Sequence, residues 1–209
     1  MPASGCIDGN PSGAEEQLMI DRQRAYTTTL DRRRTALLLV DLQYTLLNTV
    51  AEPEQLLRNV HLLLRAAQVL EIPVILTTQY AQGLGNIHRE VLRVYDGGVV
   101  FDKKTFSCFL DARFESLLRQ QAPNATNLIV AGVEAHICVA QTVLGAIDRG
   151  LTVHVPVDAI ASRNAVNLNI GISRMEGAGA IISSAEAVVY ELLGQAGTPQ
   201  FKALHPLLK

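Results

Sequence analysis

The stretch LIVAGVEAHICVAQT, residues 128–142, carries the clearest indication of the fold and of a site. Its start, Leu128 to Ala131, is a short apolar run that predicts a strand buried in a parallel sheet. Gly132 breaks this run, and good helix formers follow from His136 to Asp148. Cys138 therefore lies where a strand passes into a helix, at the carboxyl edge of the sheet, which is the usual ligand site of such folds.

The position of Cys138 allows two interpretations. A helix N-terminus lowers the pKa of a thiol and offers free N–H groups to an anion, so a cysteine nucleophile is well placed there. Free cysteine is also among the side chains most often buried as small apolar groups, so a packing role is the alternative. Position alone gives the two interpretations similar weight.

The composition is that of a globular intracellular protein. The chain has 209 residues, of which 48% are hydrophobic, enough for one α/β domain with a sizeable core. The net charge of −2 gives no electrostatic reason to expect nucleic acid as a partner, and the apolar runs are too short to span a membrane. The three cysteines are an odd number without C-x-x-C spacing, which predicts reduced thiols in an intracellular, cytoplasmic compartment.

The first part of the chain differs in character from the rest. Residues 1–33 are predicted to form an N-terminal tail, flexible over 1–18, where Gly, Pro and Ser are frequent. This tail lacks the apolar core of a signal peptide, and its acidic residues argue against a standard transit peptide. A short organelle signal, and with it a mitochondrial location, stays open. Residues 34–209 are expected to form a single domain.

Strand-like and helix-like patterns alternate from residue 35 to residue 194. This alternation predicts a three-layer α/β/α fold, in which a mostly parallel, Rossmann-like sheet of six strands has helices on both faces. The strands are expected at 35–40, 73–77, 99–102, 127–131, 152–157 and 180–182. The helices are expected at 53–70, 88–95, 112–121, 136–148, 164–175 and 184–193, with a loop at 81–86.

The C-terminal segment 200–209 holds apolar side chains that need a surface to cover, namely Phe201, Leu204, Leu207 and Leu208. That surface lies either on the same subunit or on a neighbouring one. The segment therefore favours a homo-oligomer, a dimer or a tetramer.

Two further strand ends carry residues capable of chemistry. Asp41 follows the buried run Ala36 to Val40, where an unpaired carboxylate is costly, so Asp41 is either a general base beside a thiol or a turn-capping residue. Lys103 and Lys104 follow the strand predicted at 99–102, where a lysine either stabilises a thiolate or an anionic intermediate or remains at the surface. Because parallel strands end at one edge of the sheet, Asp41, Lys103 and Cys138 can converge as a base, a cation and a nucleophile.

These motifs together resemble the isochorismatase-like, or cysteine hydrolase, superfamily, over about residue 35 to the C-terminus. The marks of the resemblance are DLQ at 41–43, KKTFSCF at 103–109, GVEAHIC at 132–138 and DAIASR at 158–163. The loop TTQYAQGLG at 77–85 and the tail from Ser183 are most similar to the isochorismatase domain-containing subgroup. The resemblance also implies a homo-oligomer.

The resemblance implies a role for each of these residues. The family's catalytic aspartate falls on Asp41 and its nucleophile on Cys138. The family pattern K-x-x-x-S-x-F selects Lys103 as the catalytic lysine, with Lys104 as the fallback after a one-residue shift. A non-proline cis peptide before the nucleophile would join Val133 to Glu134, and the N–H groups of Glu134 and Cys138 would then face a developing oxyanion. The side chain of Glu134 could instead simply be solvated.

The chain departs from the metal-dependent nicotinamidases of this family. Those enzymes carry Asp-x-His and further histidines after the second strand, where this chain reads TTQY at 77–80, with His88 nearby. One histidine is too few for a closed metal site, so we expect no catalytic metal and no cofactor. Gln79 and Tyr80, together with Gln43, become candidate substrate contacts, with loop packing as the alternative for Tyr80. We interpret His136 as part of the turn and not as a catalytic base.

The sequence thus favours a metal-independent cysteine hydrolase that acts on a small-molecule amide or related acyl compound through an Asp-Lys-Cys triad and a thioester. The alternatives are an isochorismate-type vinyl-ether hydrolase, for which Cys138 would be dispensable, and a non-catalytic metabolite-binding or scaffold protein that retains the fold. A nuclease is disfavoured by the net charge and by the lack of carboxylate clusters.

Overall fold

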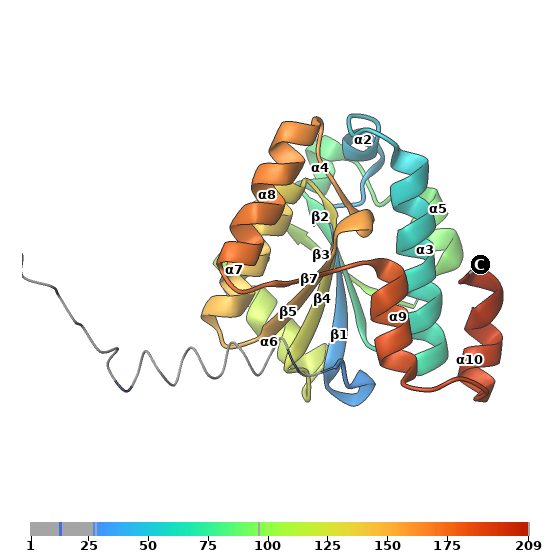
Figure 1. Cartoon of the computed structure of the whole chain (residues 1–209). Helices are drawn as coiled ribbons and strands as arrows, with labels where there is room; N and C mark the ends of the chain where they lie inside the picture. Colours follow the sequence, from blue (N-terminus) through green and yellow to red (C-terminus); the bar gives the residue numbers. More distant parts are fainter. Residues whose placement is uncertain (1–12, 14–26, 28, 96, 209) are drawn as a thin grey trace, which may run out of the picture.

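The computed structural model describes residues 13, 27, 29–95 and 97–208. Most of the predicted tail, residues 1–33, therefore lies outside the described residues. The described chain forms a central sheet with helices on both sides (Figure 1), which confirms the predicted α/β class.

All strand pairs of the sheet are parallel, and the main strand order is β3-β2-β1-β4-β5-β7. The seventh strand, β6, is short and pairs with the end of β4. The strands are β1 (Thr35–Val40), β2 (Val74–Gln79), β3 (Val99–Lys103), β4 (Asn127–Val133), β5 (Thr152–Pro156), β6 (Ile160–Ala161) and β7 (Ile181–Ser183).

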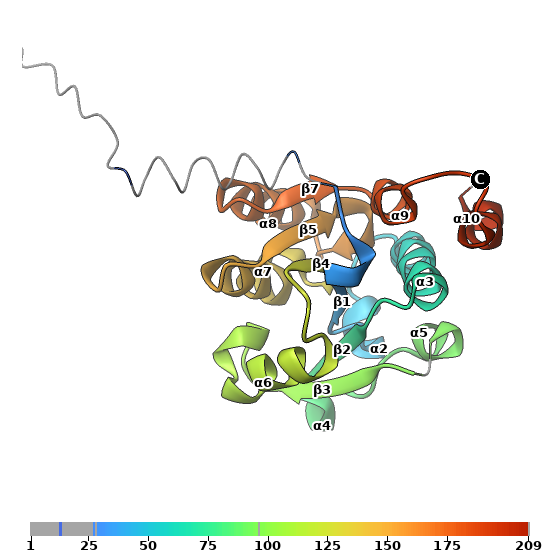
Figure 2. The same ribbon diagram turned by 90° about the horizontal axis from the view of Figure 1, so that it is seen from below.

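The helices form two layers, with α3 and α9 on one face of the sheet and α6, α7 and α8 on the other (Figures 1 and 2). The helices are α2 (Tyr44–Leu47), α3 (Pro53–Leu70), α4 (Ala81–Leu84), α5 (Arg89–Val94), α6 (Ala112–Gln121), α7 (Ala140–Asp148), α8 (Ala165–Gly177), α9 (Ala185–Leu193) and α10 (Pro199–Leu204). Shorter turns are η1 (Arg32–Arg34), η2 (Cys108–Leu110), the π-helical η3 (Ala135–Val139), η4 (Val157–Ala159) and η5 (His205–Leu207).

Strand β1 shows why the sheet needs both helix layers. All six of its residues, TALLLV, are buried. Because successive side chains of a strand point to opposite faces, Leu37 and Leu39 join the core beneath α3 and α9, whereas Leu38 and Val40 join the core beneath α6, α7 and α8. An apolar run without polar alternation is what a strand buried on both faces requires.

The structure differs from the sequence-based expectation at short elements. The sheet has seven strands and not six, because Ile160 and Ala161 pair with the end of β4 over a length too short to show any periodicity. The expected loop at 81–86 contains one helical turn, α4. The helix expected from His136 begins instead with the π-helical turn η3.

The C-terminal segment covers a surface of its own subunit. Leu204 of α10 is fully buried in the core cluster that includes α3, and Leu208 packs against the same cluster. Leu207 is 49% exposed. The segment therefore needs no neighbouring subunit to bury Leu204, and its apolar content alone does not require an oligomer.

The order of the strands defines a crevice between β1 and β4. From β1 the chain moves outward through β2 and β3, and then returns to the other side of β1 to form β4, β5 and β7. The carboxyl ends of the two strands at such a reversal leave a crevice in which ligands bind. Asp41 follows β1, and the turn with Cys138 follows β4, so both residues lie at this point.

Gly132 allows β4 to approach β1 closely, and we expect its replacement to be costly. Gly132 has a φ of 121°, and a Cβ there would lie 2.1 Å from the carbonyl oxygen of Val40. Gly132→Ala should lower the free energy of unfolding by more than about 3 kcal/mol, because backbone strain adds to a clash with the neighbouring strand. Urea denaturation measures this change.

The matched control is Gly150→Ala, where φ is 78° and nothing lies within 4 Å of the added Cβ. It should lose only about 1 kcal/mol, from the positive φ. Equal losses for the two variants would contradict the importance of the close approach between the strands.

Candidate active site

Asp41 lies at the end of β1 with its side chain fully buried. Its backbone is left-handed, with a φ of 52°, a conformation that aspartate tolerates better than most residues. Thr77 of β2 donates a hydrogen bond of 2.7 Å from Oγ1 to Asp41 Oδ1 and accepts one of 3.2 Å from the Asp41 N–H. Strand β2 therefore holds both the backbone and the carboxylate of Asp41.

Lys103, the last residue of β3, forms a buried ion pair with Asp41. Its Nζ lies 2.7 Å from Asp41 Oδ2, and both side chains are 0% exposed. The lysine Nζ also donates to Oε1 of Gln79 on the intervening strand β2, at 2.8 Å. Lys104, the fallback, is exposed, with its Nζ 5.6 Å from the centre of the Tyr80 ring. The structure thus brings Lys103, and not Lys104, to Asp41.

Cys138 lies in η3, where its side chain faces the same group of residues. It is 5% exposed, and its Sγ is 3.9 Å from Gln79 Oε1. Burial raises the pKa of the Cys138 thiol well above its usual range, and the negative charge of Asp41 raises the pKa further, while Lys103 acts in the opposite direction. The expectation of a thiol pKa lowered by a helix N-terminus is therefore wrong for this environment.

The turn before Cys138 is held by residues from the β6–α8 junction. The peptide bond from Val133 to Glu134 is cis, as the resemblance implied. The Glu134 carboxylate is buried and not solvated: its Oε2 accepts hydrogen bonds from the N–H and Nε of Arg163, at 3.0 and 3.1 Å. His136 Nδ1 lies 3.0 Å from Ser162 Oγ, which fits the interpretation of His136 as part of the turn.

Gln43 and Gln79 form an interlocked pair. Gln43 Oε1 accepts from the Gln79 N–H at 2.7 Å, and Gln43 Nε2 donates to the carbonyl oxygens of Gln79 and Gly85 at 3.1 and 2.6 Å. Gln43 is 0% exposed, so its amide is both buried and satisfied. Gln43 ties the loop after β2 to the end of β1, and its role as a substrate contact stays a prediction.

Gln79 and Tyr80 lie differently with respect to solvent. The Gln79 Nε2 donates to the Lys104 carbonyl at 2.8 Å, which turns its Oε1 toward Lys103 and Cys138. The Tyr80 side chain is 42% exposed and precedes α4. Of the three candidate substrate contacts, Tyr80 is thus the one with an accessible side chain.

Sequence reasoning missed Thr77 and Arg163 as supports of the site. Thr77 lies two residues before Gln79 on β2, and a strand places residues two apart on one face, so this pattern was present. Arg163 belongs to the DAIASR motif, but its pairing with Glu134 depends on β6 lying beside β4. Only the three-dimensional arrangement shows that pairing.

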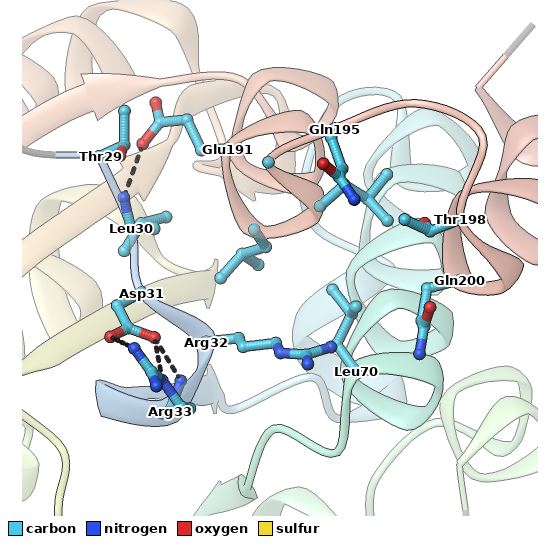
Figure 3. A pocket seen from close by; sticks show the side chains of 13 residues that line it. Thr29, Leu30, Asp31, Arg32, Arg33, Leu70, Glu191, Gln195, Thr198 and Gln200 are labelled. Carbon is cyan, nitrogen blue, oxygen red and sulfur yellow. Dashed lines mark hydrogen bonds and ion pairs between the residues drawn. The ribbon is translucent and has the colours of Figure 1, made fainter.

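A cavity of about 580 Å³ lies at the opposite edge of the sheet, beside the turn that precedes β1, and Figure 3 shows the residues that line it. It is lined by η1 and by the ends of α3 and α9, and Arg32 extends into it toward Leu70. Helix C-termini favour a cation, which accounts for an arginine there. Size alone therefore does not identify the functional site of this chain.

Comparison with known proteins identifies the family. The isochorismatase domain model matches residues 35–187, so the chain belongs to the isochorismatase family, and it has the fold of a hydrolase. Human isochorismatase domain-containing protein 2 is 35% identical over 175 residues, which cover 84% of this chain and 83% of the human protein. The resemblance to that subgroup is confirmed.

Solved structures of similar proteins share the architecture. The MAR1 ribonuclease of Caenorhabditis elegans superposes with a TM-score of 0.80 at 33% identity, covering 87% of this chain and 92% of that protein. The YcaC gene product of Escherichia coli, described as an octameric hydrolase of unknown specificity, superposes with a TM-score of 0.80 at 28% identity, covering 86% of this chain and 90% of that protein.

Within the described residues, no helix is both long and apolar enough to cross a bilayer.

The raised pKa of Cys138 predicts how its thiol responds to alkylation. Because iodoacetamide reacts with the thiolate, modification of the wild type at pH 8 should be slow and should rise only toward alkaline pH. Asp41→Asn removes the negative charge that raises the pKa, so Cys138 should react faster. Lys103→Met removes the cation that lowers it, so Cys138 should react more slowly.

Peptide mass spectrometry measures these rates, and Cys108 provides an internal control. Burial raises the pKa of Cys108 to about 11, and the residue is 0% exposed, so it should stay unmodified in all variants. Rapid alkylation of wild-type Cys138 well below pH 8 would contradict the raised pKa.

Proposed function

We propose that this protein is a metal-independent cysteine hydrolase that cleaves a small-molecule amide or related acyl compound. The observation that carries the proposal is the buried ion pair between Lys103 and Asp41 beside the thiol of Cys138. A base, a cation and a nucleophile close together and shielded from water are the parts that activate a weak nucleophile.

The reaction would proceed through a thioester. Asp41 takes the thiol proton as Cys138 Sγ bonds to the carbonyl carbon of the substrate, and Lys103 stabilises the developing thiolate. The N–H groups of Glu134 and Cys138 bind the resulting oxyanion. When the oxyanion collapses, the C–N bond breaks and the amine leaves with the proton held by Asp41. Water then loses a proton to Asp41 and attacks the thioester, which releases the acid and, with that proton, restores the thiol.

The raised pKa of Cys138 is compatible with this mechanism. A neutral thiol in the resting enzyme needs a base in contact with it, and Asp41 is the carboxylate whose charge acts on the thiol. The thiolate would form only while it attacks a bound substrate, with Lys103 already in place. This order of events makes both members of the ion pair necessary for the reaction.

Substitution of the triad tests the proposal. In a screen of small neutral amides, Cys138→Ala, Asp41→Asn and Lys103→Met should each lower kcat/KM by about 10³-fold or more, because the three groups act as a unit. A trapped thioester would be detected as an increase in the mass of the intact protein that corresponds to the acyl group. Retained hydrolysis in Cys138→Ala would instead favour vinyl-ether cleavage, and no turnover by the wild type would favour a binding role.

The matched control is Cys108→Ala, which removes the other described thiol and should keep most of the activity. RNA belongs in the same screen as a comparator, because the Caenorhabditis elegans relative is described as a ribonuclease. RNA cleavage that persists unchanged in Cys138→Ala would indicate contamination or a different site.

We further propose that Gln79 positions Lys103 and does not bind the substrate. Its Oε1 accepts from Lys103 Nζ, and its Nε2 is already bonded to the Lys104 carbonyl. Gln79→Met should lower kcat by about 10- to 100-fold with little change in KM, because it removes a partner of Lys103 while keeping side-chain volume. A substrate contact would instead raise KM. Tyr80→Ala, at the exposed neighbouring side chain, is the comparison variant.

We propose that the chain forms a homo-oligomer, supported by the octameric description of the Escherichia coli relative. The intracellular location expected from the three cysteines stays a prediction.

A further inference from the structure

Helix α8 carries an apolar stripe on its outer face. Val166 and Ile170 are 68% and 57% exposed, and Arg174 follows at the same spacing of four residues. Residues four apart lie on one face of a helix, so Arg174 continues the line of the apolar pair Val166 and Ile170. On the other side of the sheet, by contrast, α10 packs against α3 (Figure 2). Leu204 of α10 is fully buried there. The α8 stripe is therefore an apolar surface that the described part of the chain leaves exposed to solvent.

The stripe leads into a hollow of about 520 Å³ between η2, α7 and α8. Arg174 lines this hollow together with the half-buried Leu144 and Ile147 of α7. Leu110 of η2, at 72% the most exposed of the large apolar side chains described, also lines it. An apolar projection therefore stands beside an apolar depression on the same face.

The charges around the hollow are of both signs and are only partly neutralised. Arg149 is fully engaged, since it bonds to Glu115 at 3.0 Å and to the carbonyl oxygens of Gly145 and Phe109. Asp148 is 85% exposed and reaches Arg149 only at 3.9 Å. Arg174 is exposed and forms no ion pair with any residue that the structure describes. Asp148 thus has one long ion pair, and Arg174 has none with the described residues, so an acid and a base able to take a further partner lie at the same hollow.

We propose that this face binds a second copy of the chain through a two-fold interface. In such an interface the same surface meets itself, so a face with a projection, a depression and both signs of charge is self-complementary. Leu110 of each copy enters the hollow of the other, and Asp148 of each copy pairs with Arg174 of the other. The inference rests on the self-association proposed above and assigns it to η2, α7 and α8, in place of the C-terminal segment.

A charge exchange tests the interface. Asp148→Arg and Arg174→Asp each place like charges across the axis and should lower the mass measured by sedimentation or light scattering by about twofold, because a two-fold contact joins two copies. The double variant Asp148→Arg/Arg174→Asp restores opposite charges and should recover the wild-type mass. Leu110→Lys should dissociate the interface, because it removes the apolar contact and places a cation in a hollow that Arg149 and Arg174 line.

The control is Tyr190→Asp on α9, which changes a 45% exposed aromatic residue of the opposite layer and should leave the mass unchanged. Circular dichroism shows whether each variant is folded. A monomeric wild type would overturn self-association altogether. A wild-type oligomer that survives Leu110→Lys and both single charge variants would overturn this surface alone. A double variant that stays dissociated would overturn the pairing of Asp148 with Arg174.

Discussion

The buried ion pair between Lys103 and Asp41 is the interaction on which the rest of the site depends. Two opposite charges at 0% exposure are costly unless each has further hydrogen-bonding partners. Here β2 lies between the strands that carry the pair, and it supplies both partners: Thr77 to Asp41 and Gln79 to Lys103. The strand order β3-β2-β1 and the pairing of Gln79 with Lys103 are therefore conditions for holding the charges in place.

The same network extends from the ion pair to the surrounding loops. The Gln43 side chain forms hydrogen bonds with both the N–H and the carbonyl oxygen of Gln79. It also donates to the carbonyl oxygen of Gly85, which follows α4. On the other side of the crevice, Glu134 and Arg163 join the turn after β4 to the start of α8. A buried polar network with every member satisfied favours one arrangement over its alternatives. These buried polar residues thus hold the proposed triad in place, whereas the Tyr80 side chain is accessible.

The sequence was sufficient to predict the bounds of an element where its apolar pattern is long and repetitive. The helices at 53–70 and 112–121 match the predicted ranges because their apolar residues recur at helical spacing, and the strand at 35–40 matches because its run is uninterrupted. Asp41, Lys103 and Cys138 could be brought together from sequence because parallel strands end at one edge. The two-residue strand β6 could not be predicted, since it depends on pairing with β4. For the same reason the partners of Glu134 and Gln43 could not be inferred: each bond joins segments far apart in the chain.

The pKa of Cys138 could not be predicted from the position of the residue in the sequence, because it depends on the groups that surround the thiol in the fold. A helix N-terminus favours a thiolate, but burial and the Asp41 carboxylate oppose it, and the side chain is only 5% exposed. The environment that keeps the thiol neutral also strengthens the electrostatic effect of Lys103, because charges interact more strongly away from water. A buried thiol beside a carboxylate and an ammonium group therefore favours its neutral form, and in the proposed mechanism it becomes a thiolate only as its proton passes to Asp41. On this view the high pKa and the proposed nucleophilic role have the same physical origin, which is the exclusion of water from the crevice between β1 and β4.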